Sequence, residues 1–83
     1  HYDHKGEVCN PVDSILNGAD DNASGAAALL AIARALAAAP VKPKRSILFL
    51  WHCGEEDGMT GAKYFTGAPL IPLTQLAVLI NAD

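Results

Sequence analysis

Residues 46–52 read SILFLWH, and the five consecutive side chains from 47 to 51 are all apolar. An apolar run without alternation is typical of a strand that is buried on both faces, as in α/β proteins. A second run of this kind, LAVLI, covers residues 76–80. We therefore expect two buried strands, and the residues before and between them decide how the strands are connected.

Helical signals flank the first strand. Over residues 24–38 apolar side chains recur at helical spacing, and Arg34 is the only charged residue in this segment. We expect Asn22 or Ser24 to cap the start of this helix and Pro40 to end it. A short helix is expected over 60–66, with loops at 4–19 and 67–72. The order of helix, strand, helix and strand predicts an α/β fold with a mostly parallel sheet.

Composition excludes several classes of protein. A chain of 83 residues allows one small domain, and its net charge of −3 argues against a nucleic-acid partner. No apolar run is long enough for a membrane span. Cys9 and Cys53 make neither a disulfide framework nor a zinc knuckle, and at most they could form one disulfide with each other. The chain opens on His1 and stops directly after an apolar run, so we expect an internal piece of a longer protein.

Polar residues collect where the predicted strands and the long helix begin or end. They are His1 and Asp3, the pair Asp20 and Asp21, the pair Glu55 and Glu56, and Asp83. In open α/β sheets, sites form beyond the carboxyl ends of the strands. Carboxylates that converge there repel one another without a cation, and a histidine with several carboxylates suits a zinc-type ion.

Each of these residues also has an ordinary interpretation. An acidic pair in a loop is usually solvated. Aspartates before a helix usually stabilise the positive end of the helix dipole. His4 and His52 are interpreted here as residues without a role in the site. On composition and spacing alone, a metal-dependent hydrolase and a generic α/β fragment therefore both stay open.

Four motifs occur in order and add weight to the first interpretation. They are HYDH at 1–4, NGADDNASG at 17–25, GEEDG at 54–58 and INAD at 80–83. Together they resemble the successive site motifs of the aminopeptidase Y-type family of co-catalytic dizinc peptidases, which includes bacterial leucyl aminopeptidase-like enzymes. The resemblance implies that residues 1–83 are part of a catalytic domain, a three-layer α/β/α sandwich whose N- and C-terminal parts are missing.

The resemblance also implies metal ligands. His1 and Asp83 would bind a first zinc ion, and Asp3 would orient the imidazole of His1. Asp20 would bridge the two ions, and the Asp20–Asp21 peptide bond is expected to be cis. Glu56 would bind the second ion, whose histidine ligand lies beyond Asp83 in the family, so the second site is expected to be incomplete.

The implied reaction is hydrolysis of N-terminal peptide bonds, with Glu55 as the general base and peptide or protein N-termini as substrates. A carboxypeptidase or a glutaminyl cyclase on the same fold is an alternative, as is a receptor-like relative without activity. The complete acidic set favours hydrolysis over cyclisation and weighs against the relative without activity, and the carboxypeptidase stays open. Members of the family are often exported, but the sequence gives neither the compartment nor the oligomeric state.

Overall fold

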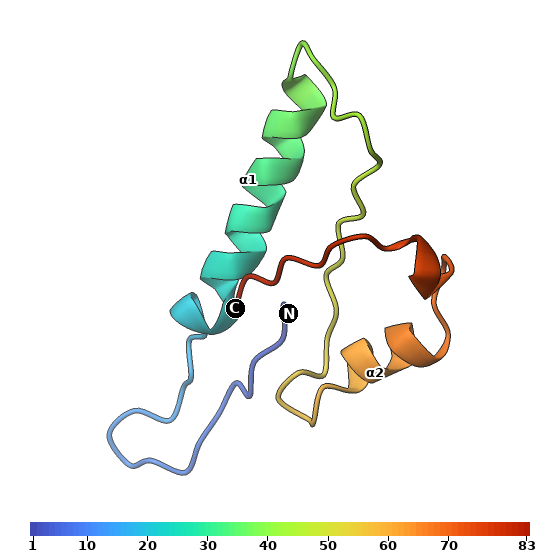
Figure 1. Ribbon diagram of the computed structural model, residues 1–83. Coiled ribbons are helices and arrows are strands. Elements are labelled where there is room, and N and C mark those ends of the chain that lie inside the picture. The colour runs from blue at the N-terminus through green and yellow to red at the C-terminus, as the bar shows by residue number, and fades with distance from the viewer.

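The computed structural model describes all 83 residues and contains two α-helices. A short π-helical turn η1 (Ala19–Ala23) leads into the long helix α1 (Ser24–Ala38). Helix α2 (Thr60–Gly67) and a single 3-10 turn η2 (Leu73–Gln75) follow. The predicted long helix is confirmed with its bounds, and the predicted short helix is confirmed with one further residue. Both chain ends lie near the N-terminal end of α1 (Figure 1).

Helix α1 begins and ends for local reasons. The Asn22 Oδ1 accepts a hydrogen bond from the Gly25 N–H at 3.1 Å, which satisfies one of the free amides of the first turn. Ser24 does not act as a cap, because its hydroxyl donates to the Asp20 carbonyl at 3.0 Å. At the other end Ala39 is extended, with φ −60° and ψ 134°, as expected for a residue before proline.

The two predicted strands are extended segments without a β-ladder, which corrects the expectation of buried strands. The only bridge in the chain pairs Glu7 with Ile15, inside the loop that precedes η1. A strand needs a hydrogen-bonded neighbour, and neither 46–52 nor 76–80 has one. Most of their apolar side chains are exposed, by 49% for Ile47 and by 86% for Ile80, whereas Phe49 and Trp51 are half-buried. The expected parallel sheet stays a prediction.

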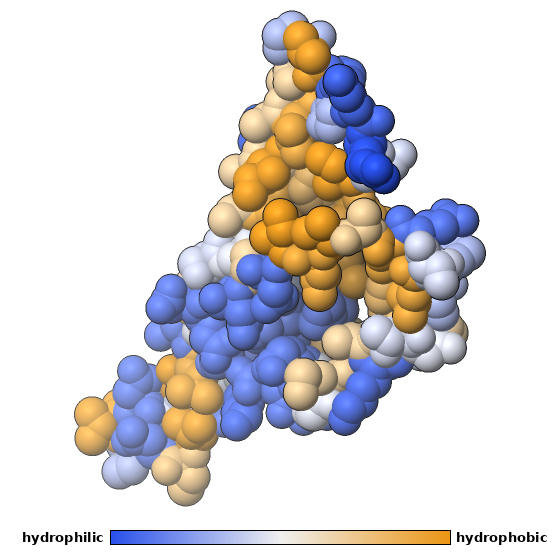
Figure 2. All heavy atoms as spheres, in the orientation of Figure 1, coloured by the Kyte–Doolittle hydropathy of each residue, from blue (hydrophilic) through white to orange (hydrophobic).

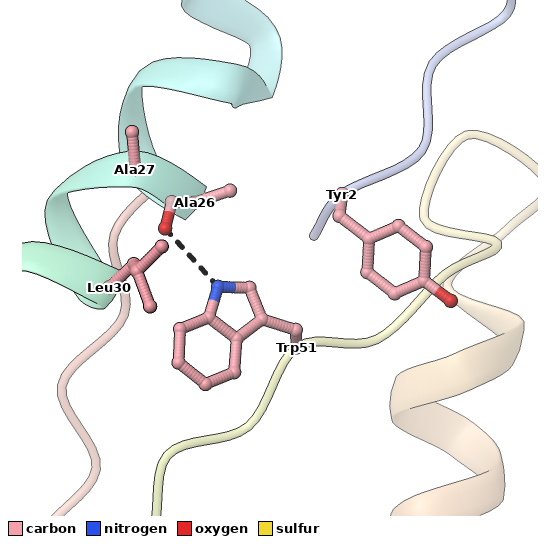
Figure 3. A pocket seen from close by; sticks show the side chains of 5 residues that line it. All are labelled: Tyr2, Ala26, Ala27, Leu30 and Trp51. Carbon is pink, nitrogen blue, oxygen red and sulfur yellow. Dashed lines mark hydrogen bonds between the residues drawn. The ribbon is translucent and has the colours of Figure 1, made fainter. Parts of the chain in front are cut away.

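The segment 46–52 is nevertheless attached to α1. The Trp51 indole N–H donates to the Ala26 carbonyl at 3.2 Å, and Trp51 stacks on Phe49. Trp51 and Tyr2 line an apolar groove of about 410 Å³ against the first turns of α1 (Figure 3). The first turns of the helix also meet the end of segment 76–80, since Leu29, Leu50 and Ile80 line one smaller cavity.

No apolar side chain is fully buried, and Asn22 is the only buried residue. The radius of gyration is 15.8 Å, whereas a compact domain of this length would have about 12 Å. The molecule is only 14 Å thick in its shortest dimension. Figure 2 shows apolar surface along α1 and across the middle of the molecule, and a hydrophilic patch at the foot of α1, where the termini meet. The tightest packing therefore lies in the polar region around Asn22, and the chain has no hydrophobic core of its own.

Two further expectations concern the cysteines and the membrane. Cys9 and Cys53 are both free and exposed, so the disulfide left open by the sequence does not form here. Neither helix combines the length and the apolar character that crossing a bilayer requires.

Candidate metal centre

The side chain of His1 lies at the centre of the polar region and is only 2% exposed. Its Nδ1 lies 3.0 Å from the backbone carbonyl oxygen of Asp3. A carbonyl can only accept, so Nδ1 carries the proton and donates it. The other ring nitrogen, Nε2, can then present its lone pair to the site, which is the usual arrangement of a metal-binding histidine.

The expected partner of Nδ1 was the carboxylate of Asp3, and the structure modifies that expectation. The nearer carboxylate oxygen is 3.4 Å from Nδ1, farther than the carbonyl of the same residue. The carboxylate instead accepts the Glu55 N–H at 3.4 Å. Asp3 therefore orients His1 through its backbone and holds the glutamate loop through its side chain.

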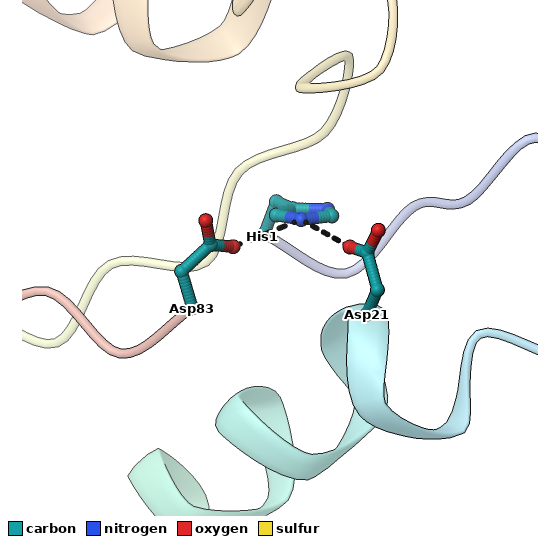
Figure 4. Close-up of side chains that lie close together, drawn as sticks. All are labelled: His1, Asp21 and Asp83. Carbon is teal, nitrogen blue, oxygen red and sulfur yellow. Dashed lines mark ion pairs between the residues drawn. The ribbon is translucent and has the colours of Figure 1, made fainter.

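Two carboxylates face Nε2 of His1 from distant parts of the chain (Figure 4). The Oδ1 atoms of Asp21 and Asp83 lie 3.1 and 3.2 Å from Nε2. Glu55 is farther away, with Oε2 at 3.9 Å. Two ligands of one tetrahedral zinc ion stand about 3.3 Å apart, given metal–ligand bonds of about 2.0–2.2 Å. The separations around His1 therefore suit one shared ion.

The electrostatics of this arrangement require a positive charge. A neutral imidazole with its proton on Nδ1 would turn a lone pair toward two negative oxygens at Nε2. Burial of the ring opposes its protonation, but the hydrogen bond to Asp3 and the charges of Glu55, Asp83 and Asp3 outweigh it. The pKa of His1 is consequently raised above its usual 6.5. Either a second proton or a metal ion can supply the missing charge at Nε2.

Asp3 stays ionised beside this centre. Burial alone would raise the pKa of its carboxyl, but the backbone N–H groups of Glu55, Asp3, Gly54 and Glu56 lower it below the usual value. Its charge adds to the attraction that the site has for a cation.

A second group of ligand atoms lies next to the first. His4, Asp21 and Glu56 each offer one atom, and the three atoms lie within 4.8 Å of one another. The His4 Nδ1 and the Glu56 Oε1 are 2.7 Å apart, yet neither atom has a hydrogen-bond partner of acceptable geometry and both are buried. Buried polar atoms without partners are rare, and a cation between them would satisfy both. These residues therefore fit a second metal position.

Asp21 belongs to both groups and Asp20 to neither, which corrects the expected bridging residue. Asp21 has extended backbone angles, φ −120° and ψ 89°, that direct its carboxylate toward His1. The carboxylate of Asp20 lies instead 3.3 Å from the Ser24 hydroxyl at the start of α1. The cis peptide bond is likewise displaced by one residue, since it joins Asp21 to Asn22.

The glutamates are held by a tight loop that follows the segment 46–52. Gly54 has φ +72°, a conformation that favours glycine, and its carbonyl accepts the Thr60 N–H at 2.7 Å. The Glu55 carbonyl accepts the Met59 N–H at 2.8 Å. The N-terminal segment lies beside this loop because the Tyr2 N–H donates to the His52 carbonyl at 3.1 Å. Backbone contacts thus bring His1 and Glu55 together.

Most of the residues singled out in the sequence meet in this region. His1, Asp83 and Glu55 surround Nε2, Asp3 supports them, and Glu56 faces the second group. In the sequence, Asp21 was placed at the site without a role as a ligand, and His4 was interpreted as a residue outside the site. The HxxH spacing of His1 and His4 could have indicated His4, whereas nothing in the sequence separates two adjacent aspartates.

Comparisons with known proteins give a consistent result. The model of peptidase family M28 matches residues 1–83. A "Probable zinc metalloprotease" of Pyrenophora tritici-repentis is 39% identical over all of this chain and 19% of that protein. "Leupeptin-inactivating enzyme 1" of Streptomyces exfoliatus is 35% identical over 87% of this chain and 17% of its own length. A "Vacuolar membrane protease" of Verticillium alfalfae is 40% identical over 70% of the chain and 6% of its own length.

The chain thus spans less than a fifth of the length of these relatives. No solved structure matches it.

The position of Asp21 in both ligand groups predicts a clear difference between two neighbouring substitutions. In the intact protein, Asp21→Asn should weaken zinc binding at least about 100-fold, more than the loss usual for residues behind the ligands. Asp20→Asn is the matched control and should leave zinc affinity within about twofold. Competition with a coloured chelator measures both. Weaker binding for Asp20→Asn and not for Asp21→Asn would reverse the assignment.

The raised pKa of His1 predicts how zinc affinity depends on pH. Zinc binds the neutral imidazole, so affinity should fall as the pH drops through the folded pKa of His1, which lies above 6.5. Without metal the sign is opposite: the stability contributed by protonated His1 is present at low pH and is lost as the pH rises through that pKa. Chelator competition between pH 5 and 8 tests the first trend. An affinity that is constant down to pH 6 would contradict it, and His1→Gln should reduce the pH dependence in that range.

Proposed function

Because the chain belongs to peptidase family M28, we propose that the intact protein is a zinc-dependent exopeptidase that removes residues from peptide N-termini. The observation that carries this proposal is the carboxylate of Asp21, which is shared by two groups of ligand atoms. A carboxylate has two oxygens and can bind two cations at once. The names of the relatives support zinc as the metal.

The proposed ligand sets follow from the two groups. His1, Asp21 and Asp83 would hold the first ion, and Asp21, Glu56 and His4 face the second position. When bound, the ions would polarise the peptide carbonyl and lower the pKa of a water molecule toward 7. The donors are nitrogen and oxygen atoms, which zinc accepts readily.

Glu55 is the proposed general base. Its carboxylate lies 3.9 Å from Nε2 of His1 but belongs to neither ligand group, so it is free to exchange a proton. It is partly exposed, at 35%, which leaves room for water and substrate beside it. Glu55 would accept a proton from the attacking water and return it to the amine of the leaving product. The Asp3 side chain fixes the loop that carries Glu55.

We further propose that these residues are part of a larger catalytic domain, an α/β/α sandwich. The extended segments 46–52 and 76–80 support this, because their apolar side chains are exposed and their backbone groups lack ladder partners. Contiguous apolar surface of this kind is rare on the outside of a soluble domain. Additional strands of the same protein would cover it.

The base assignment predicts a loss of turnover without a loss of metal. In the intact protein, Glu55→Gln should lower kcat for an aminoacyl anilide about 10²–10⁴-fold, because the amide cannot accept the proton. Zinc content should stay unchanged. Asp57→Asn is the matched control, since it removes a neighbouring exposed carboxylate, and its kcat should stay near that of the wild type. Undiminished hydrolysis by Glu55→Gln, or loss of its zinc, would refute the assignment.

The same assay separates the proposed specificity from its alternatives. An aminopeptidase should hydrolyse the free aminoacyl anilide and not its N-acetylated counterpart. Preferential release of C-terminal residues would indicate a carboxypeptidase, and pyroglutamate formation would indicate a cyclase. Zinc binding without any of these reactions would favour a relative without activity.

A further inference from the structure

Asn22 is the only residue of the chain that is buried as a whole, main chain and side chain together, at 2% exposure. Its carboxamide is satisfied at both ends. The Nδ2 donates to the Ala82 carbonyl at 3.1 Å, and the Oδ1 accepts the Gly25 N–H at 3.1 Å. One side chain thus connects the start of α1 with a segment 60 residues farther along the chain.

Each end of this link adjoins a residue of the first ligand group. Asp21 directly precedes Asn22, and Asp83 directly follows Ala82. The side chains of Asp21 and Asp83 are 63% and 57% exposed, and each forms an ion pair with the Nε2 of His1. Because little else holds these side chains, the distance between them depends on where their backbones lie.

The backbones approach very closely at this point. A Cβ added to Gly25 would overlap the Asn22 Oδ1 and would lie 2.6 Å from the Ala82 carbonyl oxygen. Such a contact is shorter than real Cβ atoms show, so only glycine fits between the two segments. Gly25 and Asn22 together therefore fix the separation of the helix start and the end of segment 76–80.

We propose that Asn22 is a positioning residue that sets the distance between Asp21 and Asp83 and so tunes the affinity of the first metal position. The inference rests on the proposed metal centre and extends it. Asn22 touches neither metal nor substrate; it acts through the backbone of Ala82, which carries Asp83. Removal of the link would let Asp83 move away from His1, while Asp21 would stay attached to the helix start.

The test is a double-mutant cycle on zinc affinity in the intact protein, measured by chelator competition. Asn22→Ala should weaken zinc binding about 10–100-fold, as for other residues that orient ligands. In an Asp83→Asn background the same substitution should change affinity by less than about twofold, because the ligand that it positions is already lost. An equal loss in both backgrounds would mean a general structural role and would overturn the proposal.

Ser24→Ala is the matched control. It removes a side-chain hydrogen bond from the same helix start, but the partner of that bond is the Asp20 carbonyl and not that of Ala82. It should leave zinc affinity unchanged in both backgrounds. A loss as large as that of Asn22→Ala would show that any damage to the start of α1 weakens the site, which would also overturn the proposal.

A second variant serves if Asn22→Ala does not fold. Asn22→Ser keeps a side-chain oxygen at the start of α1 and removes the carboxamide donor to Ala82 without adding a charge. The same dependence on Asp83 is therefore expected. Equal effects in both backgrounds would again overturn the proposal. Because the readout is zinc binding, an intact protein that binds zinc without hydrolysing peptides would refute the proposed function and leave this inference standing.

Discussion

The structure depends on one electrostatic constraint, the meeting of two carboxylates with the unprotonated edge of a buried imidazole. The Asp3 carbonyl fixes the proton of His1 on Nδ1. The lone pair of Nε2 therefore faces the carboxylate oxygens of Asp21 and Asp83, and none of these three atoms carries a proton to donate. Such a cluster is stable only with a cation or an additional proton at its centre. The raised pKa of His1 expresses the same need, because the protein favours a positive charge there.

The frame around this cluster consists of polar backbone contacts rather than of apolar packing. Asn22 links the start of α1 to Ala82, and the N–H of Tyr2 links the first residues to His52. No apolar side chain is fully buried. These long-range hydrogen bonds hold the site residues together. The apolar faces of 46–52 and 76–80 need partner strands before they contribute stability.

The sequence predicted the parts of this structure that depend on local signals. Helix α1 matched its expected bounds because its periodicity and the proline at position 40 are both local. The two strands could not be confirmed, since a ladder depends on neighbouring strands. In the site, Asp20 and Asp21 differ in backbone angles that the sequence does not reveal. The spacing of His4 from His1 is only a weak signal, and the fold gives it meaning by placing His4 beside Glu56. The sandwich architecture stays a prediction for the same reason as the strands.

The central claim is that folding gathers these side chains around divalent metal. Anomalous diffraction from crystals of the intact protein, collected above and below the zinc absorption edge, tests it most directly. We expect a zinc peak about 2.0–2.2 Å from the His1 Nε2 and from oxygens of Asp21 and Asp83. We also expect a second peak beside Glu56 that shares Asp21. Crystals grown with zinc that show no anomalous density within bonding distance of His1 would contradict the account.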